Sequence, residues 1–224
     1  MQGMRHRTLS IVLLIAVAVA PAVTARSRRN RSLSSAPGSF DYYLLSLSWA
    51  PTWCGQDAAR TSSAECMPGR HTGFIVHGFW PEAATAKSPE FCGQAGRVGD
   101  ATVRMVLPLM LSANLIQHEW AAHGTCSGLS SYDYFSALVQ VRAKVQIPVQ
   151  LNSASAEMKI SPAEIENQFA AVNSGFPKNA FRTACVRGLL EEERICFDKN
   201  LNPLACTASA RECGDGRIAI PPTL

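Results

Sequence analysis

The chain has 224 residues, 47% of them hydrophobic and 17% charged, which is enough for one domain with a sizeable core. Its formal net charge is +4, but the charge is unevenly spread. Setting aside the six arginines of residues 1–39, a stretch without acidic residues, leaves 15 basic against 17 acidic side chains in residues 40–224. That part is therefore not a polycation, and its bulk charge neither requires nor excludes a nucleic-acid partner.

The first 25 residues have the pattern of a secretory signal peptide. Arg5 and Arg7 precede an apolar run of about 12 residues, and small residues surround Ala25. The run is shorter than the ~20 residues that span a bilayer, which argues against a membrane anchor. We predict cleavage after Ala25, export to the periplasm or the extracellular space, and no membrane attachment afterwards. Residues 26–39 then form a basic, flexible lead-in, and residues 40–224 a single domain.

Two aromatic and aliphatic runs predict the first strands. The first is 40-FDYYLLSLSW-49, bounded by Gly38 and Pro51. The second, 74-FIVHGFW-80, predicts a short buried strand that ends at Gly78 and Pro81.

Helical patterns follow in the middle of the chain. Pro108 is expected to break or kink the first helix, Gly124 to cap the end of the second, and Ser161 to cap the start of the last. The predicted helices are residues 102–113, 115–123, 134–146 and 161–172.

The periodicity changes again after the last of these helices. Residues 180–190 and 191–198 are predicted as paired strands, and residues 199–203 as the turn that follows. The fold class is therefore α+β, an antiparallel sheet with several helices packed on it and partly segregated from it along the sequence.

An even number of cysteines behind a signal peptide argues for four disulfides. Spacing suggests one local pair, Cys54 with Cys66, and a group of four near the end of the chain, but it does not fix the connectivity. No CxxC pair occurs, which disfavours a zinc ribbon or a thioredoxin-type site. The eight positions are Cys54, Cys66, Cys92, Cys126, Cys185, Cys196, Cys206 and Cys213.

The segment 118-HEWAAHGTC-126 contains several side chains that could take part in catalysis or bind a metal. A zinc-protease helix places its two histidines four residues apart, on one face. His118 and His123 are five apart, or about 140° around a helix, whereas Glu119 and His123 are four apart and share a face. The spacing favours a carboxylate beside an imidazole over a metal clamp.

A third histidine, His77, lies in 74-FIVHGFWPE-82. A lone histidine on a buried strand is most simply a core residue bonded to backbone. Together with 118-HEWAAHGTC-126, however, this segment resembles the two active-site motifs of the secreted ribonuclease T2 family, HGLWP and HEWxKHGTC. Phe79 replaces the leucine of the first motif, and Ala122 replaces the lysine of the second. The resemblance extends from about Phe40 to the last cysteine and implies a disulfide-stapled, ribonuclease T2-like fold.

The resemblance also implies roles for individual residues. His123 would be the general base and His77 the general acid, while His118 would hold the phosphate and Glu119 would assist at the phosphoryl group or tune His123. Metal-free cleavage of RNA needs such a base, an acid and donors at the phosphoryl oxygens. The ordinary imidazole pKa of about 6.5 allows one ring to be neutral while another is charged.

Further positions follow from the same resemblance. Trp80 and Glu82 match places where a base stacks and is hydrogen-bonded, with core packing as an even alternative for Trp80. The implied disulfides, beyond the local pair, are Cys92–Cys126, Cys185–Cys213 and Cys196–Cys206.

We therefore predict a secreted, monomeric endoribonuclease of little base specificity that cleaves single-stranded RNA through a 2′,3′-cyclic phosphate, without cofactor or metal. Ala122 motivates the alternative, a catalytically weakened relative acting as a secreted binding or signalling protein, because losing one charge stabiliser costs ~10²–10³ in rate. Arg70 and Lys87 are candidates to replace the missing cation. A zinc hydrolase using the three histidines is the weakest reading.

Overall fold

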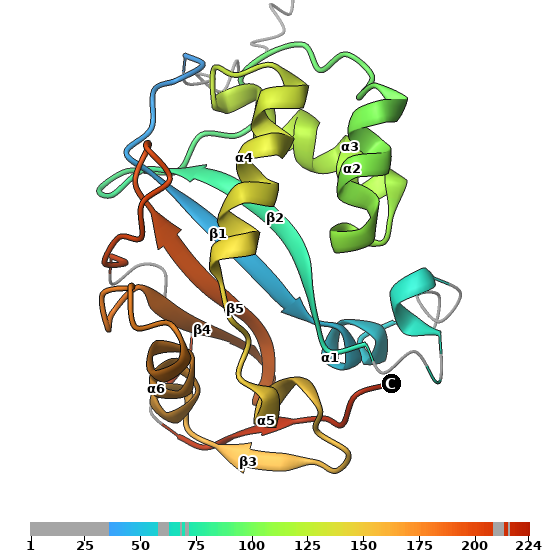
Figure 1. Ribbon diagram of the computed structural model, residues 1–224, viewed down its shortest axis with the longest axis vertical. Helices are drawn as coiled ribbons and strands as arrows, with labels where there is room; N and C mark the ends of the chain where they lie inside the picture. Colours follow the sequence, from blue (N-terminus) through green and yellow to red (C-terminus); the bar gives the residue numbers. More distant parts are fainter. Residues whose placement is uncertain (1–35, 58–62, 68, 70–71, 208–212, 215) are drawn as a thin grey trace, which may run out of the picture. The chain divides into compact units, whose positions relative to one another are not determined.

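The computed structural model describes residues 36–57, 63–67, 69, 72–207, 213–214 and 216–224 (Figure 1). The predicted signal peptide, most of the predicted lead-in, and Arg70 lie outside these residues. Within the described part of the chain, no helix is both long and apolar enough to cross a bilayer.

A mixed sheet forms the centre of the folded part. Within the described residues it has six strands in the order β2-β1-β5-β6-β3, and β4 pairs with β5 as a hairpin. The pairings are antiparallel except for the short contact between β5 and β6. The strands are β1 (Tyr42–Trp49), β2 (Phe74–Glu82), β3 (Met158–Ile160), β4 (Phe181–Val186), β5 (Leu189–Phe197) and β6 (Ile218–Ile220).

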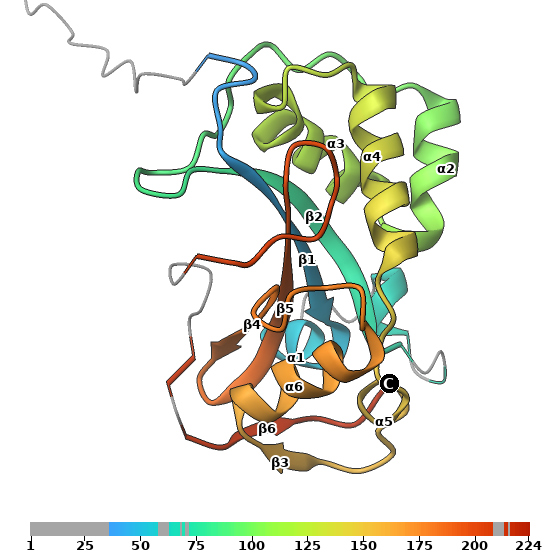
Figure 2. The same cartoon turned by 60° about the vertical axis from the view of Figure 1, so that its left-hand side comes forward.

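The helices form two groups around this sheet. Figures 1 and 2 show α2, α3 and α4 together beside β1 and β2, and α6 beside β4. The helices are α1 (Ala50–Gly55), α2 (Asp100–Met110), α3 (Ala113–Ala122), α4 (Ser131–Lys144), α5 (Val149–Asn152) and α6 (Pro162–Val172), with 3₁₀ turns at Ala64–Cys66 and Gly124–Cys126. The α+β class predicted from the sequence is confirmed.

Serine caps begin three of the helices. Ser112, Ser130 and Ser161 each accept a hydrogen bond from the backbone N–H three residues later. At α6 the side chain of Glu164 returns the bond to the N–H of Ser161, which completes the capping box expected from the sequence. Each cap contributes about 1 kcal/mol to helix stability.

The core lies between α4 and one face of β1. Leu45 and Leu47 of β1 are fully buried and share a cluster with Tyr134 and Leu138 of α4. Burying a side chain of this size contributes roughly 1.5–3 kcal/mol. The alternate residues of β1 face the other side of the sheet, where the candidate site lies.

Two boundaries differ from the sequence prediction at prolines. β2 continues through Gly78 and Pro81 to Glu82. Proline is tolerated there because β2 is the edge strand of the sheet. Pro108 likewise lies inside α2, which ends two residues later where Leu111 adopts a left-handed conformation with φ 58°.

The last hairpin also turns earlier than predicted. Arg187 (φ 50°) and Gly188 (φ 78°) form a two-residue turn, so residues 189 and 190 belong to β5. Two consecutive positive φ values are typical of a type I′ turn. An arginine at the first position hides that turn from sequence reading, because non-glycine residues rarely adopt it.

The prediction that Gly124 caps the end of α3 is wrong, because His123 holds that position. Gly124 opens a 3₁₀ turn with an ordinary φ, and a Cβ added there would collide with the ring of Trp120. Glycine is needed at this position for close packing, not for left-handed backbone.

All four predicted disulfides are confirmed: Cys54–Cys66, Cys92–Cys126, Cys185–Cys213 and Cys196–Cys206. The second of these ties the segment after β2 to the end of α3 across a sequence separation of 34 residues. Closing a loop of that length stabilises the fold by about 4 kcal/mol in the chain-entropy model. It also holds the end of α3 against the strand that carries His77.

Candidate active site

A β-bulge in β2 brings two ring side chains to one face of the sheet. Val76 and Gly78 pair with consecutive residues of β1, so His77 between them is an extra residue. A bulge shifts the alternation of side chains, so that His77 and Trp80, three residues apart, point to the same face. Their ring centroids lie 5.2 Å apart in an edge-to-face arrangement.

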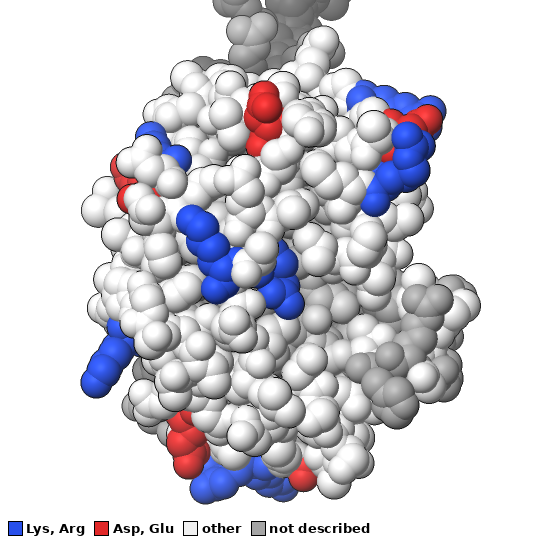
Figure 3. All heavy atoms as spheres, in the orientation of Figure 1, with Lys and Arg blue, Asp and Glu red and all other residues white. Residues whose placement is uncertain are grey.

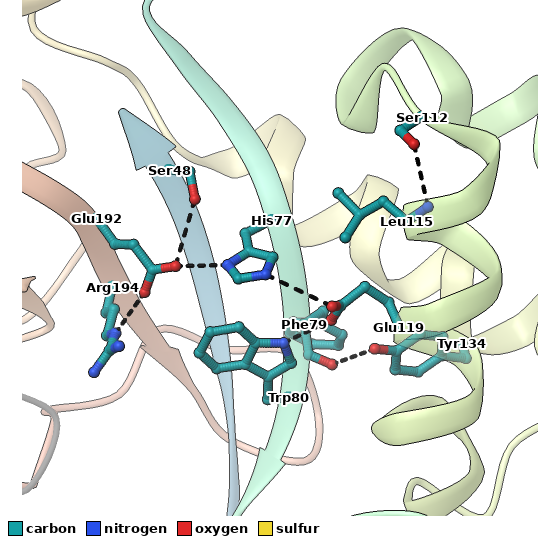
Figure 4. Close-up of polar contacts among 10 residues, drawn as sticks. All are labelled: Ser48, His77, Phe79, Trp80, Ser112, Leu115, Glu119, Tyr134, Glu192 and Arg194. Carbon is teal, nitrogen blue, oxygen red and sulfur yellow. Dashed lines mark hydrogen bonds and ion pairs between the residues drawn. The ribbon is translucent and has the colours of Figure 1, made fainter. Parts of the chain in front are cut away.

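Short side chains on β1 allow side chains of β2 and β5 to contact each other across the face of β1. Ser48 pairs with Glu192, and Ser46 pairs with Arg194. Because both serines are small, His77 reaches across β1, and its Nδ1 lies 2.6 Å from Oε1 of Glu192 (Figure 4). Arg194 Nε donates to Oε2 of the same carboxylate at 2.9 Å, and Ser48 Oγ donates to Oε1 at 3.4 Å.

Helix α3 contributes a buried carboxylate from the opposite side. The side chain of Glu119 is 1% exposed, and its Oε2 accepts the indole N–H of Trp80 at 2.7 Å. Its Oε1 lies 3.7 Å from Nε2 of His77. A Cβ at Gly78 would collide with both Glu119 and Trp80, so only glycine at that position allows this hydrogen bond.

His123 completes the group directly after α3. Its ring centroid lies 5.3 Å from that of Trp80, so His77 and His123 are both neighbours of the Trp80 ring. His118 is exposed on α3, and its charge acts on both Glu119 and His123. The structure thus brings His77, His123 and Glu119 next to one tryptophan, with His118 exposed close by on α3.

The imidazoles of His77 and His123 have opposite pKa shifts. Burial lowers the pKa of His77, but the hydrogen bond and charge of Glu192, together with the charge of Glu119, outweigh burial and raise it. Burial also lowers the pKa of His123, and the positive charges of His77 and His118 lower it further, to about 4. At a pH between the lowered pKa of His123 and the raised pKa of His77, His77 is charged and His123 is neutral.

The carboxyl groups of Glu119 and Glu192 also have opposite pKa shifts. Burial raises the pKa of Glu119, and the charge of His77 and the hydrogen bond from Trp80 offset only part of that effect. Burial also acts to raise the pKa of Glu192, but the hydrogen bond and charge of His77 and the charge of Arg194 hold it at about 2. Glu192 is therefore a fixed anion, whereas Glu119 binds a proton more readily than a free glutamate.

Glu82, the other predicted substrate contact, lies at the far end of β2. Its carboxylate accepts a hydrogen bond from Ser88, and burial raises its pKa. Nearer to His77, a cavity of about 160 Å³ lies between the sheet and the start of α3. It combines hydroxyl and apolar walls from Ser48, Trp53, Ser63, Ile75, Ser112 and Leu115.

Sequence reasoning missed Glu192 and Arg194. The signal was present, because the two residues share a face of a predicted strand, where charged side chains are costly to bury without partners. What the sequence lacked was the strand order, which places them opposite Ser48 and Ser46 and within reach of β2.

Of the two candidates named above to replace the cation of the motif lysine, the structure describes only Lys87. Ala122 is 3% exposed and lies on the same face of α3 as Glu119. Lys87 is an exposed surface residue whose Nζ lies 3.9 Å from Glu90. Arg194, whose guanidinium carbon lies 5.8 Å from the centre of the Trp80 ring, is a cation that the structure does place beside the site.

The molecular surface shows no continuous basic band on the face that α4 covers. In Figure 3 the lysine and arginine side chains of that face occur in small separate groups. Within the described residues, no group of three or more His, Cys, Asp or Glu side chains is arranged to hold a metal ion.

The fold and the site together define a class: an α+β protein with four disulfides, in which two histidines and a glutamate lie next to one tryptophan. The sequence model of the Ribonuclease T2 family matches residues 40–206. The chain therefore belongs to the Ribonuclease T2 family.

Individual relatives agree with this assignment. A probable ribonuclease of Haemophilus influenzae is 29% identical, over 77% of this chain and 63% of that protein. A ribonuclease of Aeromonas hydrophila is 36% identical, over 57% of each. The chain thus matches less than two thirds of the length of either relative.

A solved structure supports the fold. The RNase-related protein from Calystegia sepium superimposes with a TM-score of 0.63 over 81% of this chain and 97% of that one, at 24% identity. At this identity the likeness concerns the fold alone.

Proposed function

We propose that the protein is an endoribonuclease that cleaves single-stranded RNA by metal-free transphosphorylation, with little base specificity. The observation that carries the proposal is the pair of imidazoles next to Trp80, one with a raised pKa and one with a pKa of about 4. Groups whose environments push their pKa values apart are suited to act as an acid and a base in one reaction.

The reaction follows from these protonation states. Neutral His123 takes the proton of the 2′-hydroxyl, whose oxygen attacks the adjacent phosphorus. Charged His77 gives its Nε2 proton to the leaving 5′-oxygen, and a 2′,3′-cyclic phosphate forms. Hydrolysis of the cyclic phosphate is the slower second step, with the two roles exchanged. DNA lacks the nucleophile, so RNA is the substrate.

His118 and Glu119 act at the phosphoryl oxygens in this scheme. The side chain of His118 is exposed on α3, where it can contact a phosphate of the RNA substrate. Glu119 is held in place by the indole N–H of Trp80 and lies 3.7 Å from Nε2 of His77, so it is placed to assist at the phosphoryl group.

Trp80 and Glu82 are the proposed substrate contacts from β2. Trp80 is only partly buried, so part of its indole is available to a base, and stacking on an aromatic contributes ~1–3 kcal/mol. The cavity beside His77 offers hydroxyl groups and apolar walls to a second base. Neither place presents the dense set of donors and acceptors that a strict base preference requires.

We further propose that the protein acts as a monomer outside the cytosol, secreted or in the periplasm. Four disulfides support this location, because such bonds form and persist in oxidising compartments.

The test is incubation of the purified, oxidised protein with RNA at pH 5–7 in the presence of EDTA. We expect short products with 2′,3′-cyclic phosphate ends, and no cleavage of an oligonucleotide in which every sugar is 2′-deoxy. Cleavage that EDTA abolishes would overturn the metal-free mechanism. Intact RNA in all samples would favour the weakened binding protein.

A further inference from the structure

The two ring nitrogens of His77 face different carboxylates. Nε2 points toward Glu119 at 3.7 Å, on the side where the reaction takes place. Nδ1 points away from it, to Glu192 at 2.6 Å. The side chain of His77 is 35% exposed, whereas that of Glu192 is 5% exposed, so Glu192 itself is out of reach of a substrate.

Glu192 is fixed in place on both oxygens. Oε1 receives the contacts of His77 and Ser48, and Oε2 accepts the Nε–H of Arg194 at 2.9 Å (Figure 4). Arg194 is in turn held over the ring of Trp80. A carboxylate anchored in this way has one orientation, and it imposes that orientation on the imidazole.

We propose that Glu192 is a positioning residue for His77: its carboxylate accepts the Nδ1–H and thereby holds the Nε2–H toward the leaving 5′-oxygen. The inference rests on the proposed function, because it assigns a partner to the general acid. In the transfer step the Nε2–H bond breaks and an O–H bond forms on the 5′-oxygen. The Nδ1–H bond stays intact, so the neutral ring retains the Nε2 lone pair for the second step.

The charges that face His77 explain why Glu192 matters for the ionisation of the ring. Glu192 and Glu119 favour the imidazolium, whereas Arg194 disfavours it; His123, with a pKa of about 4, is neutral where His77 titrates. Glu192 makes the only direct hydrogen bond to His77 among the contacts of the described residues. Without its charge, Glu119 alone opposes Arg194 and the cost of burial, so the pKa of His77 falls.

The proton does not move on to Glu192. Burial acts to raise the pKa of that carboxyl, but His77 and Arg194 hold it at about 2, so the group is ionised at the pH 5–7 of the cleavage assay. Glu192 acts through His77 and never as the proton donor itself.

The experiment follows the imidazole nitrogens of His77 by ¹⁵N NMR across pH, in the wild type, Glu192→Gln and Glu192→Asp, with kcat/KM for RNA cleavage measured in parallel. Glu191→Gln is the matched control, because it removes the neighbouring charge of β5 that makes no contact with His77. In the wild type we expect a His77 pKa above 6.5 and, at high pH, a neutral ring with the proton on Nδ1.

Glu192→Gln should lower the pKa of His77 and move the alkaline limb of kcat/KM to lower pH by the same amount. Above the limb, that costs about tenfold in rate for each pH unit of the shift. Glu192→Asp, which keeps the charge, should restore the limb toward that of the wild type, and Glu191→Gln should leave it unchanged. A merely structural role would lower the rate without moving the limb.

The inference is overturned if folded Glu192→Gln titrates like the wild type, or if the neutral wild-type ring carries its proton on Nε2. The wild-type titration decides the matter even where Glu192→Gln does not fold. A wild type that shows the expected titration but leaves RNA intact would remove the proposed function and leave the assignment of Glu192 to His77 standing.

Discussion

The two sides of the site give one type of side chain two different chemistries. On the sheet side, His77 lies between two carboxylates, which raise its pKa despite burial. On the helix side, His123 has Trp80 as its ring neighbour and the positive charges of His77 and His118 nearby, and its pKa is lowered to about 4. The environment, not the residue type, separates the pKa values of the two rings.

The two sides also differ in how they are held. His77 depends on the register of three strands, because the bulge in β2 and the serines of β1 allow it to meet Glu192. His123 depends on the end of a helix that Cys92–Cys126 ties to the segment after β2. Substitutions can therefore disturb either side separately.

Removing either ring should have the largest effect. His77→Phe and His123→Phe keep a flat side chain but lose the proton donor or acceptor, and each should lower kcat by ~10²–10⁴-fold. Steady-state cleavage of a dinucleoside phosphate measures this, with near-ultraviolet circular dichroism to confirm the fold. Near-full activity of either folded variant would make the acid–base assignment wrong.

Gly78→Ala tests the contact between the two sides. The new Cβ collides with Glu119 and Trp80 and separates the carboxylate from the indole. Displacements of about 1 Å at a reacting centre cost ~10²-fold, which we expect in kcat. Gly175→Ala is the control, because no atom lies within 4 Å of a Cβ there. Equal activity of the two variants would contradict the geometry.

Trp80→Phe separates two roles of the tryptophan. Phenylalanine keeps an aromatic face for a base but has no N–H for Glu119. If the hydrogen bond is the main role, kcat should fall by about 10- to 100-fold, as expected for a bond to a charged group worth about 1.5–3 kcal/mol, while KM stays near that of the wild type. A rise in KM alone would show that Trp80 serves to stack the base.

Ala122→Lys should have the smallest effect and the opposite sign. It restores the motif lysine and adds a positive charge one residue before His123, so kcat should rise. Ala121→Lys is the matched control, since it adds the same charge on another face of α3. An unchanged rate in Ala122→Lys would indicate that another cation, with Arg194 as the first candidate, already serves the site.

Most of the fold could be read from the sequence, because the relevant patterns are local. The capping box at Ser161, the aromatic and aliphatic run of β1 and the cysteine framework depend on neighbouring residues or on the motifs. The turn at Arg187 and the edge position that admits Pro81 do not, because one uses rare backbone angles and the other depends on strand order.

The candidate site likewise contains residues that local motifs identify and residues that depend on the order of the strands. The residues within the two motifs could be named from the sequence, and the structure gathers them. Glu192 could not, because its role depends on β1 and β5 being neighbours and on the shortness of Ser48. The pKa shifts likewise depend on burial and on contacts between distant segments.

The account is tested most directly by the pH dependence of kcat/KM from pH 3 to 9. His123 must be neutral, so the rate should fall as pH drops through about 4, and His77 must be charged, so the rate should fall as pH rises through its raised pKa, above 6.5. The account predicts a broad plateau between these limbs. An acid limb near 6.5, or an alkaline limb below it, would contradict the division of the two histidines into base and acid.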